Sequence, residues 1–537
     1  MEFNLSPLLT RRQALAGAMA LGAATAMPVT GWASGVEPPA DLDALVLRAL
    51  ATFETPGAAV ALVEGGRTVL ARGYGVRRLG ASGVVDDATA FPIASLTKAF
   101  TTASIALLVE EGRLGWDDKV ADRLPGFGLH DAFASQEMTV LDLLVHRSGL
   151  GAGEGDLLWF PYTTLTRAEI VARLRYLKPV SGFRYGFAYD NVLYIAAGEL
   201  LAAVAGKPWE SFVQERLLTP LGMGDSAPVS RLLHSADRAI GHGRIDGPVR
   251  GLGPMRVLPD TTFPEVTAPA GGIWSSARDM ARWLTVQLAQ GVLPGGKRLW
   301  SEDSAARMWT PLAVAGASPF ASDDVTDPHF VLSGPGWLML DYRGTPVVMH
   351  AGSFPGGVSH LVLVPSRNFG FSIMLNSEEE TCQEMLANVL LDHYLGLPAS
   401  DWIAIGKKRD DARTLRRQAR AAKLQSGRPQ DAKAPSLALA KYAGTYRSEW
   451  YGDVVVRTEG AGLAIVFSHT PAFHGQLEIW DGDTFRTRFA DRTLEDALVT
   501  FVLTPGGSVD EIRMKAASAS ADFSYDYQDL VLKPVGS

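Results

Sequence analysis

The chain has 537 residues, of which 47% are hydrophobic and 20% charged, a balance typical of a globular protein with a large core and, at this length, two or three domains. Its formal net charge of −8 gives no basic surface for nucleic acid, and its single cysteine, Cys382, excludes an intrachain disulfide and is expected in the core. Neither a Cys/His cluster with zinc spacing nor a His-Glu-x-x-His motif occurs, so we expect no metal and no cofactor.

The first 33 residues have the pattern of an export signal. Arg11 and Arg12 form a twin-arginine core, an apolar run occupies 14–27, and small residues at 31–33 suit a signal peptidase. The run is shorter than the roughly 18 apolar residues that a membrane span needs, and no other segment reaches that length. We expect a twin-arginine signal peptide at 1–33 and a periplasmic or secreted protein; the alternative is a short apolar helix of the fold.

The next segments predict a mixed domain. A surface helix is expected at 41–52, followed by strands at 57–63 and 67–74 that are joined by the turn Gly65-Gly66. A β-hairpin therefore precedes the first motif that carries chemistry.

Ser95 and Lys98 lie three residues apart where a buried helix is expected to begin after Pro92, so both side chains are on the same side. A serine hydroxyl is a weak nucleophile unless a neighbour takes its proton, and a lysine in an apolar wall can be neutral and do so. The N–H groups of a helix start also face developing negative charge. Ser-x-x-Lys occurs once in the chain, and because a single match also arises by chance, companion motifs decide.

A helix-rich stretch is expected from residue 97 to about 233. Within it, one helix is predicted over 137–150, with Thr139 as its cap and Gly149 at its end, and His146 is interpreted as a structural residue.

The aromatic block at 183–194 contains two polar residues able to face one cleft. Tyr189 could exchange a proton and Asn191 could bind an amide group, with Asp190 pointing away or lying at the rim. The alternative is that the block is core and pocket wall. The aromatic side chains that could line an apolar pocket are Trp159, Phe160, Phe183, Tyr185 and Phe187.

Further along, Ser275 or Ser276 can cap a helix that reaches Trp283, and a strand at 347–353 ends in His350-Ala351-Gly352-Ser353. Asp279 and His360 are interpreted as structural. Strands at 361–365 and 371–376 and a helix at 382–395 complete a unit of three to five strands, which predicts an antiparallel sheet covered by helices.

The composition changes after residue 400. A Lys/Arg/Ala-rich helix is expected at 407–423, and a solvated helix is favoured there over a surface for anionic lipid or polymer. A polar linker with Gly427 and Pro429 follows, and beyond residue 441 about eight short strands predict a small barrel or curled sheet.

Three motifs that occur in order carry a family resemblance: Ser95-Leu96-Thr97-Lys98, Tyr189-Asp190-Asn191 and His350-Ala351-Gly352. Together they resemble the serine β-lactamase/penicillin-binding-protein superfamily, in its class C β-lactamase-like branch of D,D-peptidases, D-aminopeptidases and esterases. The segments 146–150 and 270–276 resemble further landmarks of that branch.

This resemblance implies an α+β fold, in which an antiparallel sheet flanked by helices and an all-helical subdomain precede a small C-terminal β-barrel. The expected domains are the signal peptide at 1–33, a β-lactamase-like serine hydrolase domain at 34–400, a charged helical linker at 401–440 and a barrel-like domain at 441–537.

The resemblance also implies an acyl-enzyme mechanism with Ser95 as nucleophile, Lys98 and Tyr189 sharing the base and acid steps in an order left open, and no metal. The N–H groups of Ser95 and Ser353 would form the oxyanion hole. The remaining site residues are implied to bind the substrate. Asn191 would bind its amide group, and His350 would hold Tyr189 and any substrate carboxylate. Gly352 is included as part of the third motif.

Two departures from the usual β-lactamase pattern bear on the substrate. His350 replaces the lysine of the third motif, and Asp190 replaces the commoner serine or alanine of the second. Both argue against efficient β-lactam turnover and favour a small peptide or amide, with an ester open. A β-lactam-binding sensor and an inert binding protein are the alternatives. The oligomeric state is left open.

Overall fold

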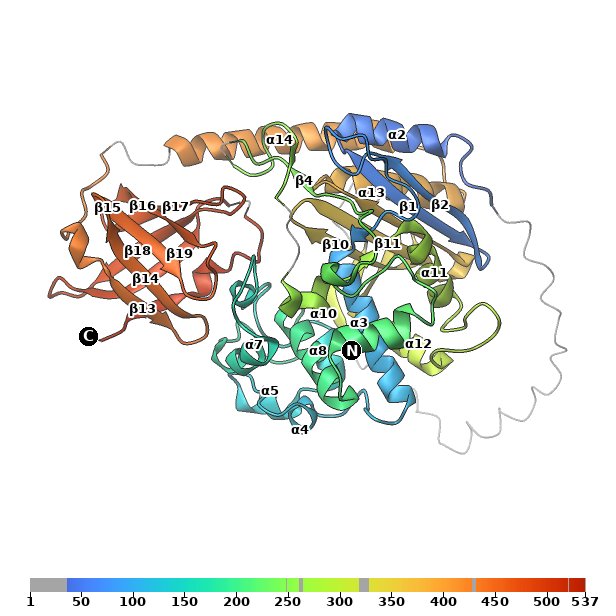
Figure 1. Ribbon diagram of the computed structural model, residues 1–537, viewed down its shortest axis with the longest axis horizontal. Helices are drawn as coiled ribbons and strands as arrows, with labels where there is room; N and C mark the ends of the chain where they lie inside the picture. The colour runs from blue at the N-terminus through green and yellow to red at the C-terminus, as the bar shows by residue number, and fades with distance from the viewer. Residues whose placement is uncertain are drawn as a thin grey trace, which may run out of the picture. The chain divides into compact units, whose positions relative to one another are not determined.

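The computed structural model describes residues 36–247, 249–259, 264–317, 328–426, 431–519 and 521–536 (Figure 1). The segment predicted to be an export signal, 1–33, lies outside these ranges. Among the helices in them, none is both long enough and apolar enough to cross a bilayer.

Within the described ranges, an eight-stranded antiparallel sheet is the centre of the first domain, in the order β2-β1-β12-β11-β10-β9-β8-β7. The strands are β1 (Gly57–Glu64), β2 (Arg67–Gly75), β7 (Ala313–Ala317), β8 (Phe330–Gly334), β9 (Trp337–Tyr342), β10 (Thr345–Phe354), β11 (Gly357–Val364) and β12 (Phe369–Leu375). The N-terminal hairpin joins the sheet through β12, about 300 residues later in the chain.

The sequence predicted an antiparallel sheet but missed β7, β8 and β9. These three strands form one edge of the sheet, and β7 and β8 contain glycine and are only partly buried. The hydrophobic alternation of β7 and β8, the signal on which strand prediction depends, is therefore weak. This reason does not apply to β9, which begins with the apolar run 337–340.

Alternate residues of β1 face two different cores, as the period of two in a strand requires. Ala58, Val60 and Leu62 pack with α2 (Leu42–Phe53) and α13 (Glu380–Leu395) on one face, where the predicted core residue Cys382 also lies. On the other face, β1 and β12 contact α11 (Ala277–Leu288), and the core there extends to α3 (Thr97–Glu110).

Helix α3 is buried along most of its length and packs against α8 (Val192–Ala205) and α10 (Ala268–Gly271). Shorter helices surround this group. They are α4 (Val120–Arg123), α5 (Ala132–Glu137), α6 (Val140–Leu144), α7 (Arg167–Arg173), α9 (Trp209–Val213) and α12 (Glu302–Met308). Ser276 caps α11, as the sequence predicted.

The single helix predicted over 137–150 is wrong. Thr139 caps α6 as expected, but the helix ends at Leu144. His146 then adopts a left-handed φ of 58° and Gly149 one of 97°, so the chain turns repeatedly where a regular helix was expected.

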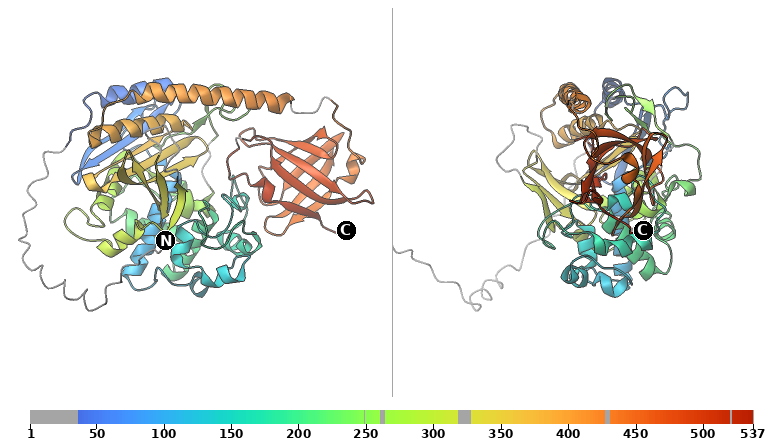
Figure 2. Two further views of the ribbon diagram at one scale, coloured as in Figure 1. Left: turned by 180° about the vertical axis from the view of Figure 1, so that it is seen from behind. Right: turned by 90° about the vertical axis from the view of Figure 1, so that its left-hand side faces the viewer.

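The C-terminal part is a closed antiparallel barrel, which confirms the predicted architecture (Figure 2). Its strands are β13 (Gly444–Ser448), β14 (Gly452–Glu459), β15 (Gly462–Phe467), β16 (His474–Asp481), β17 (Thr484–Phe489), β18 (Ala497–Leu503), β19 (Val509–Ala516) and β20 (Val531–Pro534). A long helix, α14 (Trp402–Ser426), precedes it and begins by packing Trp402 and Ile403 into the core formed with α2 and α13.

Candidate active site

Ser95 lies in a 3₁₀ turn, η1 (Ala94–Leu96), which leads directly into α3. Ala94 has a left-handed φ of 47°, a conformation that is rare for residues other than glycine and that clusters at functional sites. The start of this turn is held by β11, because Ser359 donates a hydrogen bond of 2.6 Å to the carbonyl of Ile93, the residue before the turn. The nucleophile candidate therefore sits on a constrained backbone.

Lys98 is fully buried, with Nζ 3.0 Å from Ser95 Oγ, 2.8 Å from Asn191 Oδ1 and 3.0 Å from the Ala270 carbonyl oxygen. Burial lowers the pKa of Lys98 to about 7, against the opposing charge of Asp156. A neutral amine has two N–H groups and one lone pair. The two carbonyl oxygens can accept both N–H groups, which leaves the lone pair directed at the Ser95 hydroxyl.

Tyr189 lies in the loop before α8, and its hydroxyl shares a hydrogen bond with Ser95. Burial raises the pKa of Tyr189 above its usual value, and the bond to Ser95 only partly opposes this shift. At neutral pH the side chain is thus a phenol that can donate a proton. Lys98 Nζ lies 4.8 Å from the centre of its ring.

His146 supports Tyr189 from behind. The two rings are stacked with centroids 4.4 Å apart, and the Asp190 N–H donates a 3.0 Å hydrogen bond to His146 Nδ1. Burial lowers the pKa of His146 well below its usual value, so the ring is neutral. These contacts show His146 packed and hydrogen-bonded, and its interpretation as a structural residue stays a prediction. Asp190 points away from the cleft and accepts a hydrogen bond of 2.7 Å from Ser148.

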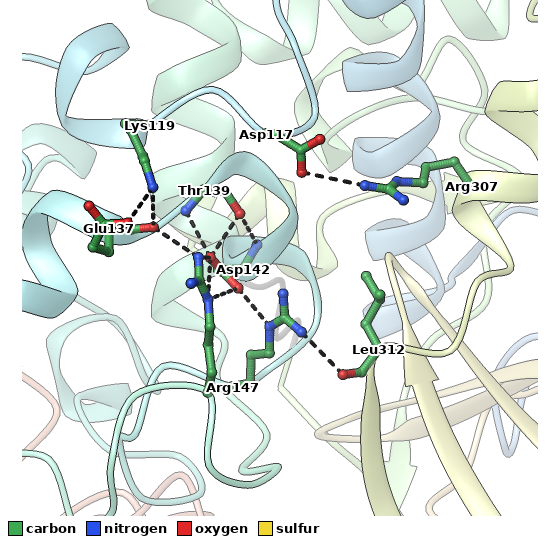
Figure 3. Close-up of polar contacts among 9 residues, drawn as sticks. Asp117, Lys119, Glu137, Thr139, Asp142, Arg147, Arg307 and Leu312 are labelled. Carbon is green, nitrogen blue, oxygen red and sulfur yellow. Dashed lines mark hydrogen bonds and ion pairs between the residues drawn. The ribbon is translucent and has the colours of Figure 1, made fainter. Parts of the chain in front are cut away.

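Next to these segments lies the Asp142 cluster, which we define as Thr139, Asp142, Arg147 and Arg184. Figure 3 labels the first three of these residues. Asp142 is fully buried and accepts bonds of 2.6 Å from Arg147 Nε and from Arg184 Nη2, and one of 2.9 Å from the Thr139 N–H. Arg147 follows His146, and Arg184 begins the stretch that leads to Tyr189. One carboxylate thus ties together the two segments that position the tyrosine.

Asn191 connects Lys98 to a second buried carboxylate, in what we define as the Asp156 cluster: Asp156, Trp159, Asn191 and Ser524. Asn191 Oδ1 accepts from Lys98, and its Nδ2 donates a 2.9 Å bond to Asp156 Oδ2. Asp156 also accepts from Trp159 Nε1 at 2.8 Å and from Ser524 Oγ, a barrel residue, at 2.7 Å. The second hydrogen on Asn191 Nδ2 is left for other partners.

The third motif lies on β10 against the Ser95 turn. β10 pairs with β9 only as far as Met349, so residues 350–354 have β11 as their described strand partner. A Cβ added to Gly352 would lie 2.5 Å from the Ile93 carbonyl and 2.4 Å from Ser359 Oγ, so only glycine allows this approach. Ser353 is exposed and lines the same cavity as Ser95.

His350 departs from its predicted role. It is buried, it does not belong to the described cavity lining, and its Nδ1–H donates to the carbonyl of Ala351 at 2.6 Å. Burial lowers its pKa to about 3, and its ring centroid lies 6.4 Å from that of Tyr189. A covered, neutral imidazole offers no positive charge to a substrate carboxylate.

Ser95, Tyr189 and Asn191 open onto a cavity of about 1230 Å³. Trp159 and Phe160 line it as predicted. The other aromatic candidates, Phe183, Tyr185 and Phe187, are absent from its described lining, and Tyr185 is 86% exposed. Residues 522–525 of the barrel form part of the wall. Across the described ranges, no three His, Cys, Asp or Glu side chains gather as a metal site.

The sequence did not identify Asp156 or Ser524 as site residues. Neither belongs to one of the three motifs, and they lie 368 residues apart. The available signal was one acidic residue, Asp156, directly before the apolar run Leu157-Leu158-Trp159. An ordinary helix start has the same pattern.

This fold and this serine–lysine–tyrosine arrangement define a class, the serine hydrolases. The beta-lactamase family model matches residues 42–396, and the chain belongs to this family, within the serine β-lactamase/penicillin-binding-protein superfamily. The predicted family is thereby confirmed. Residues 428–534, which contain the barrel, match a domain of unknown function, DUF3471.

Two relatives and two solved structures are similar to the chain. It is 27% identical to the unguisins hydrolase of Aspergillus violaceofuscus over 503 residues, 87% of this chain and 86% of that protein. It is 29% identical to penicillin-binding protein 4 of Amycolatopsis lactamdurans over 333 residues, 60% of this chain and 81% of that protein.

Both structures share the fold. The octameric penicillin-binding protein homologue from Pyrococcus abyssi has a TM-score of 0.57 at 21% identity, covering 89% of this chain and 98% of that one. The D-amino acid amidase from Ochrobactrum anthropi has a TM-score of 0.52 at 24% identity, covering 66% of this chain and 98% of that one.

Proposed function

We propose that this serine hydrolase cleaves amide or peptide bonds through an acyl-enzyme on Ser95. The observation that carries the proposal is the position of Lys98 Nζ, 3.0 Å from Ser95 Oγ, 2.8 Å from Asn191 Oδ1 and 3.0 Å from the Ala270 carbonyl oxygen. In its neutral form the amine can donate to the two carbonyl oxygens and accept the Ser95 proton. With a pKa of about 7, a large fraction of the amine is neutral at physiological pH.

In this mechanism Lys98 takes the Ser95 proton as Oγ attacks the carbonyl carbon. The N–H groups of Ser95 and Ser353 hold the oxyanion, and Tyr189, a phenol at neutral pH, passes a proton to the leaving amine. The C–N bond breaks and leaves an ester on Ser95. Water then attacks that ester, with the same groups moving protons in reverse, and releases the acid.

The neutral, covered His350 supports an amide or peptide substrate over a β-lactam, because it lacks the fixed positive charge that would attract the β-lactam carboxylate. Relatives support the same choice, since one acts on unguisins and a structural neighbour is a D-amino acid amidase. A cavity of about 1230 Å³ has room for a ligand larger than a single amino acid. An ester of similar shape is the second candidate.

A substrate panel tests this proposal. The purified enzyme is assayed with D-amino acid amides, short linear peptides, p-nitrophenyl esters and nitrocefin. We expect kcat/KM for the best amide or peptide to exceed that for nitrocefin at least about a hundredfold, roughly 2.7 kcal/mol of transition-state discrimination. A kcat/KM for nitrocefin similar to that for the best amide or peptide would contradict the proposal and indicate a β-lactamase activity. A preference for esters would favour the second candidate.

Active-site labelling tests the nucleophile. A fluorophosphonate should add one adduct to the intact protein, located at Ser95 by peptide mapping, and Ser95→Ala should abolish both labelling and turnover. Ser104→Ala is the matched control, because Ser104 is buried on α3, the helix that follows Ser95, and its hydroxyl has no described hydrogen-bond partner. An adduct at another residue would refute the assignment.

We also propose that the protein is exported by the twin-arginine route, with residues 1–33 removed. The support is the paired arginines before a short apolar run. N-terminal sequencing of the exported protein should begin near Ser34. Replacement of both Arg11 and Arg12 by lysine should retain the protein in the cytoplasm; unchanged export would contradict this proposal.

A further inference from the structure

We propose that the C-terminal barrel completes the active site, with Ser524 and Asp156 acting as positioning residues that hold Asn191, and through it Lys98, in the reactive arrangement. This inference rests on the proposed roles of Ser95 and Lys98. It assigns to the barrel a part in the chemistry, in addition to its part in the cavity wall.

A row of four hydrogen bonds connects the barrel to the nucleophile. Ser524 Oγ donates to Asp156 Oδ2 at 2.7 Å, and Asn191 Nδ2 donates to the same oxygen at 2.9 Å. Lys98 Nζ then lies 2.8 Å from Asn191 Oδ1 and 3.0 Å from Ser95 Oγ. Asp156 and Lys98 are fully buried and Ser524 and Asn191 nearly so, which strengthens the bonds among these four side chains.

Asp156 determines which end of the Asn191 amide faces Lys98. A carboxylate only accepts hydrogen bonds, so the NH₂ end of Asn191 must point to Asp156 and the oxygen must point to Lys98. If the amide were reversed, its NH₂ group would face the N–H groups of the lysine. The three donors that converge on Asp156, from Trp159, Asn191 and Ser524, all suit the ionised form of this side chain.

The barrel also holds the backbone that carries Asp156. Asp526 accepts hydrogen bonds from the N–H groups of Gly155, at 2.7 Å, and Leu157, at 3.0 Å, the two residues that flank Asp156. Phe523 reaches the same place, with its ring edge-on to that of Tyr189 and centroids 6.0 Å apart. Side chain and backbone of Asp156 are therefore both fixed from the barrel.

The charge of Asp156 acts on Lys98 as well. It raises the pKa of the lysine, opposing the larger effect of burial, while burial raises the pKa of Asp156 itself to about 6. The titratable and charged groups that interact with Asp156 come from several elements. They are Lys98 of α3, Tyr189 and Asp190 of the loop before α8, and Asp522 and Asp526 of the barrel.

The test measures the rate of Ser95 labelling by a fluorophosphonate in the full-length protein between pH 5 and 9, followed by intact mass. Ser524→Ala should slow labelling about tenfold at pH 7, and Ser524→Thr, which keeps the hydroxyl, should recover most of the rate. Ser508→Ala is the matched control, because Ser508 is an exposed barrel serine bonded to Thr504, and its rate should equal that of the wild type.

Asp156→Asn supplies a readout that a merely structural role would not move. It removes the charge but keeps an oxygen that can accept from Asn191, so the acidic limb of the labelling rate should shift to lower pH. The midpoint of that limb does not depend on how much of the variant is folded, because misfolded protein does not react.

Two outcomes would overturn the inference. Rates within twofold of wild type for Ser524→Ala, or an unmoved acidic limb for Asp156→Asn, would show that the barrel contact does not act on Lys98. Wild-type protein that is not labelled at Ser95 would instead overturn the proposed function, and this inference with it.

Discussion

Two fully buried aspartates, Asp142 and Asp156, have opposite electrostatic surroundings. Asp142 is held by two guanidinium groups, from Arg147 and Arg184, and together with the Thr139 bonds they keep its pKa below the usual value despite burial. Asp156 is held only by neutral donors in the described contacts, and burial raises its pKa to about 6. The partners of a buried carboxylate, more than its burial, decide whether it titrates near neutral pH.

The difference matches what each cluster is bonded to, because the described bonds of the Asp156 cluster reach Lys98 and those of the Asp142 cluster do not. The Asp142 cluster ties two backbone segments together and needs a charge that is constant with pH. The Asp156 cluster reaches Lys98 through one amide, and a guanidinium there would repel the protonated lysine and cancel the effect of Asp156 on it. The ion pairs of Asp142 thus hold the backbone, whereas the neutral donors on Asp156 leave its charge able to act on Lys98.

Removing the better-paired carboxylate should have the largest effect. Asp142→Ala leaves Arg147 and Arg184 without their shared partner and should lower the free energy of unfolding by about 3–5 kcal/mol in urea denaturation. Because the pKa of Asp142 is lowered by folding, its contribution is present above the unfolded value and is lost only in acid, so the deficit should stay constant from pH 5 to 8.

The control for this variant lies nearby. Asp117 is 81% exposed and pairs with Arg307 at 3.4 Å, as Figure 3 also shows, so Asp117→Ala should change stability by less than about 0.5 kcal/mol. Equal losses of unfolding free energy in Asp142→Ala and Asp117→Ala would contradict the distinction between buried and surface ion pairs.

Breaking the connection between the Asp156 cluster and the lysine should affect rate more than stability. Asn191→Ala removes the acceptor for Lys98 and should lower kcat about a hundredfold, equivalent to about 2.7 kcal/mol. The rate is expressed per Ser95 labelled by fluorophosphonate, so loss of folded protein does not contribute. A kcat within threefold of wild type would mean that Lys98 is positioned by other contacts.

A smaller change is expected when the Asp142 cluster loses one of its two arginines. Arg184→Met should cost about 1.5 kcal/mol of stability, because Arg184 is partly exposed and Arg147 still pairs with Asp142. In the Arg184→Met variant, the midpoint of the acidic limb of the kcat/KM–pH profile should remain near that of the wild type. Arg307→Met serves as the control for losing an arginine at the surface; a shifted limb in Arg184→Met would show that the Asp142 cluster also acts on Lys98.

The smallest effect should come from a third carboxyl group, Glu154, whose pKa burial raises to about 7. Its ionisation is disfavoured in the folded chain, so it lowers stability progressively as pH rises from about 4.5 to 7. Glu154→Gln keeps an acceptor for the Gly151 N–H, so its stability relative to wild type in thermal unfolding should be higher at pH 8 than at pH 5. An equal difference at both pH values would contradict this account.

The three motifs and the fold class could be predicted from the sequence, because each motif lies beside a strong local signal. Ser95 precedes a long apolar helix, Tyr189 and Asn191 precede another, and His350 to Ser353 end a strand. The turn-rich barrel strands were equally recognisable from their spacing.

The remainder of the site could not be read from the sequence, since it depends on contacts between distant segments. Asp156 and Ser524 meet only after the barrel closes onto the helical region. His350 belongs to a family motif, yet its burial and its bond to the Ala351 carbonyl come from how β10 packs, which residue type and spacing do not specify. The same limit explains why the sequence did not separate the aromatic side chains that line the cavity, Trp159 and Phe160, from those absent from its described lining.

The contact between the Ser95 turn and β10 has room for one methyl group. Ala94 provides it, at a left-handed φ, and a Cβ added at Gly352 would come within 3.0 Å of that methyl. This steric condition is independent of the substrate, whereas residue 350 can differ with the charge of what is bound. In related proteins we therefore expect glycine at the position of Gly352, which the fold requires. The residue at the position of His350 should vary with the substrate.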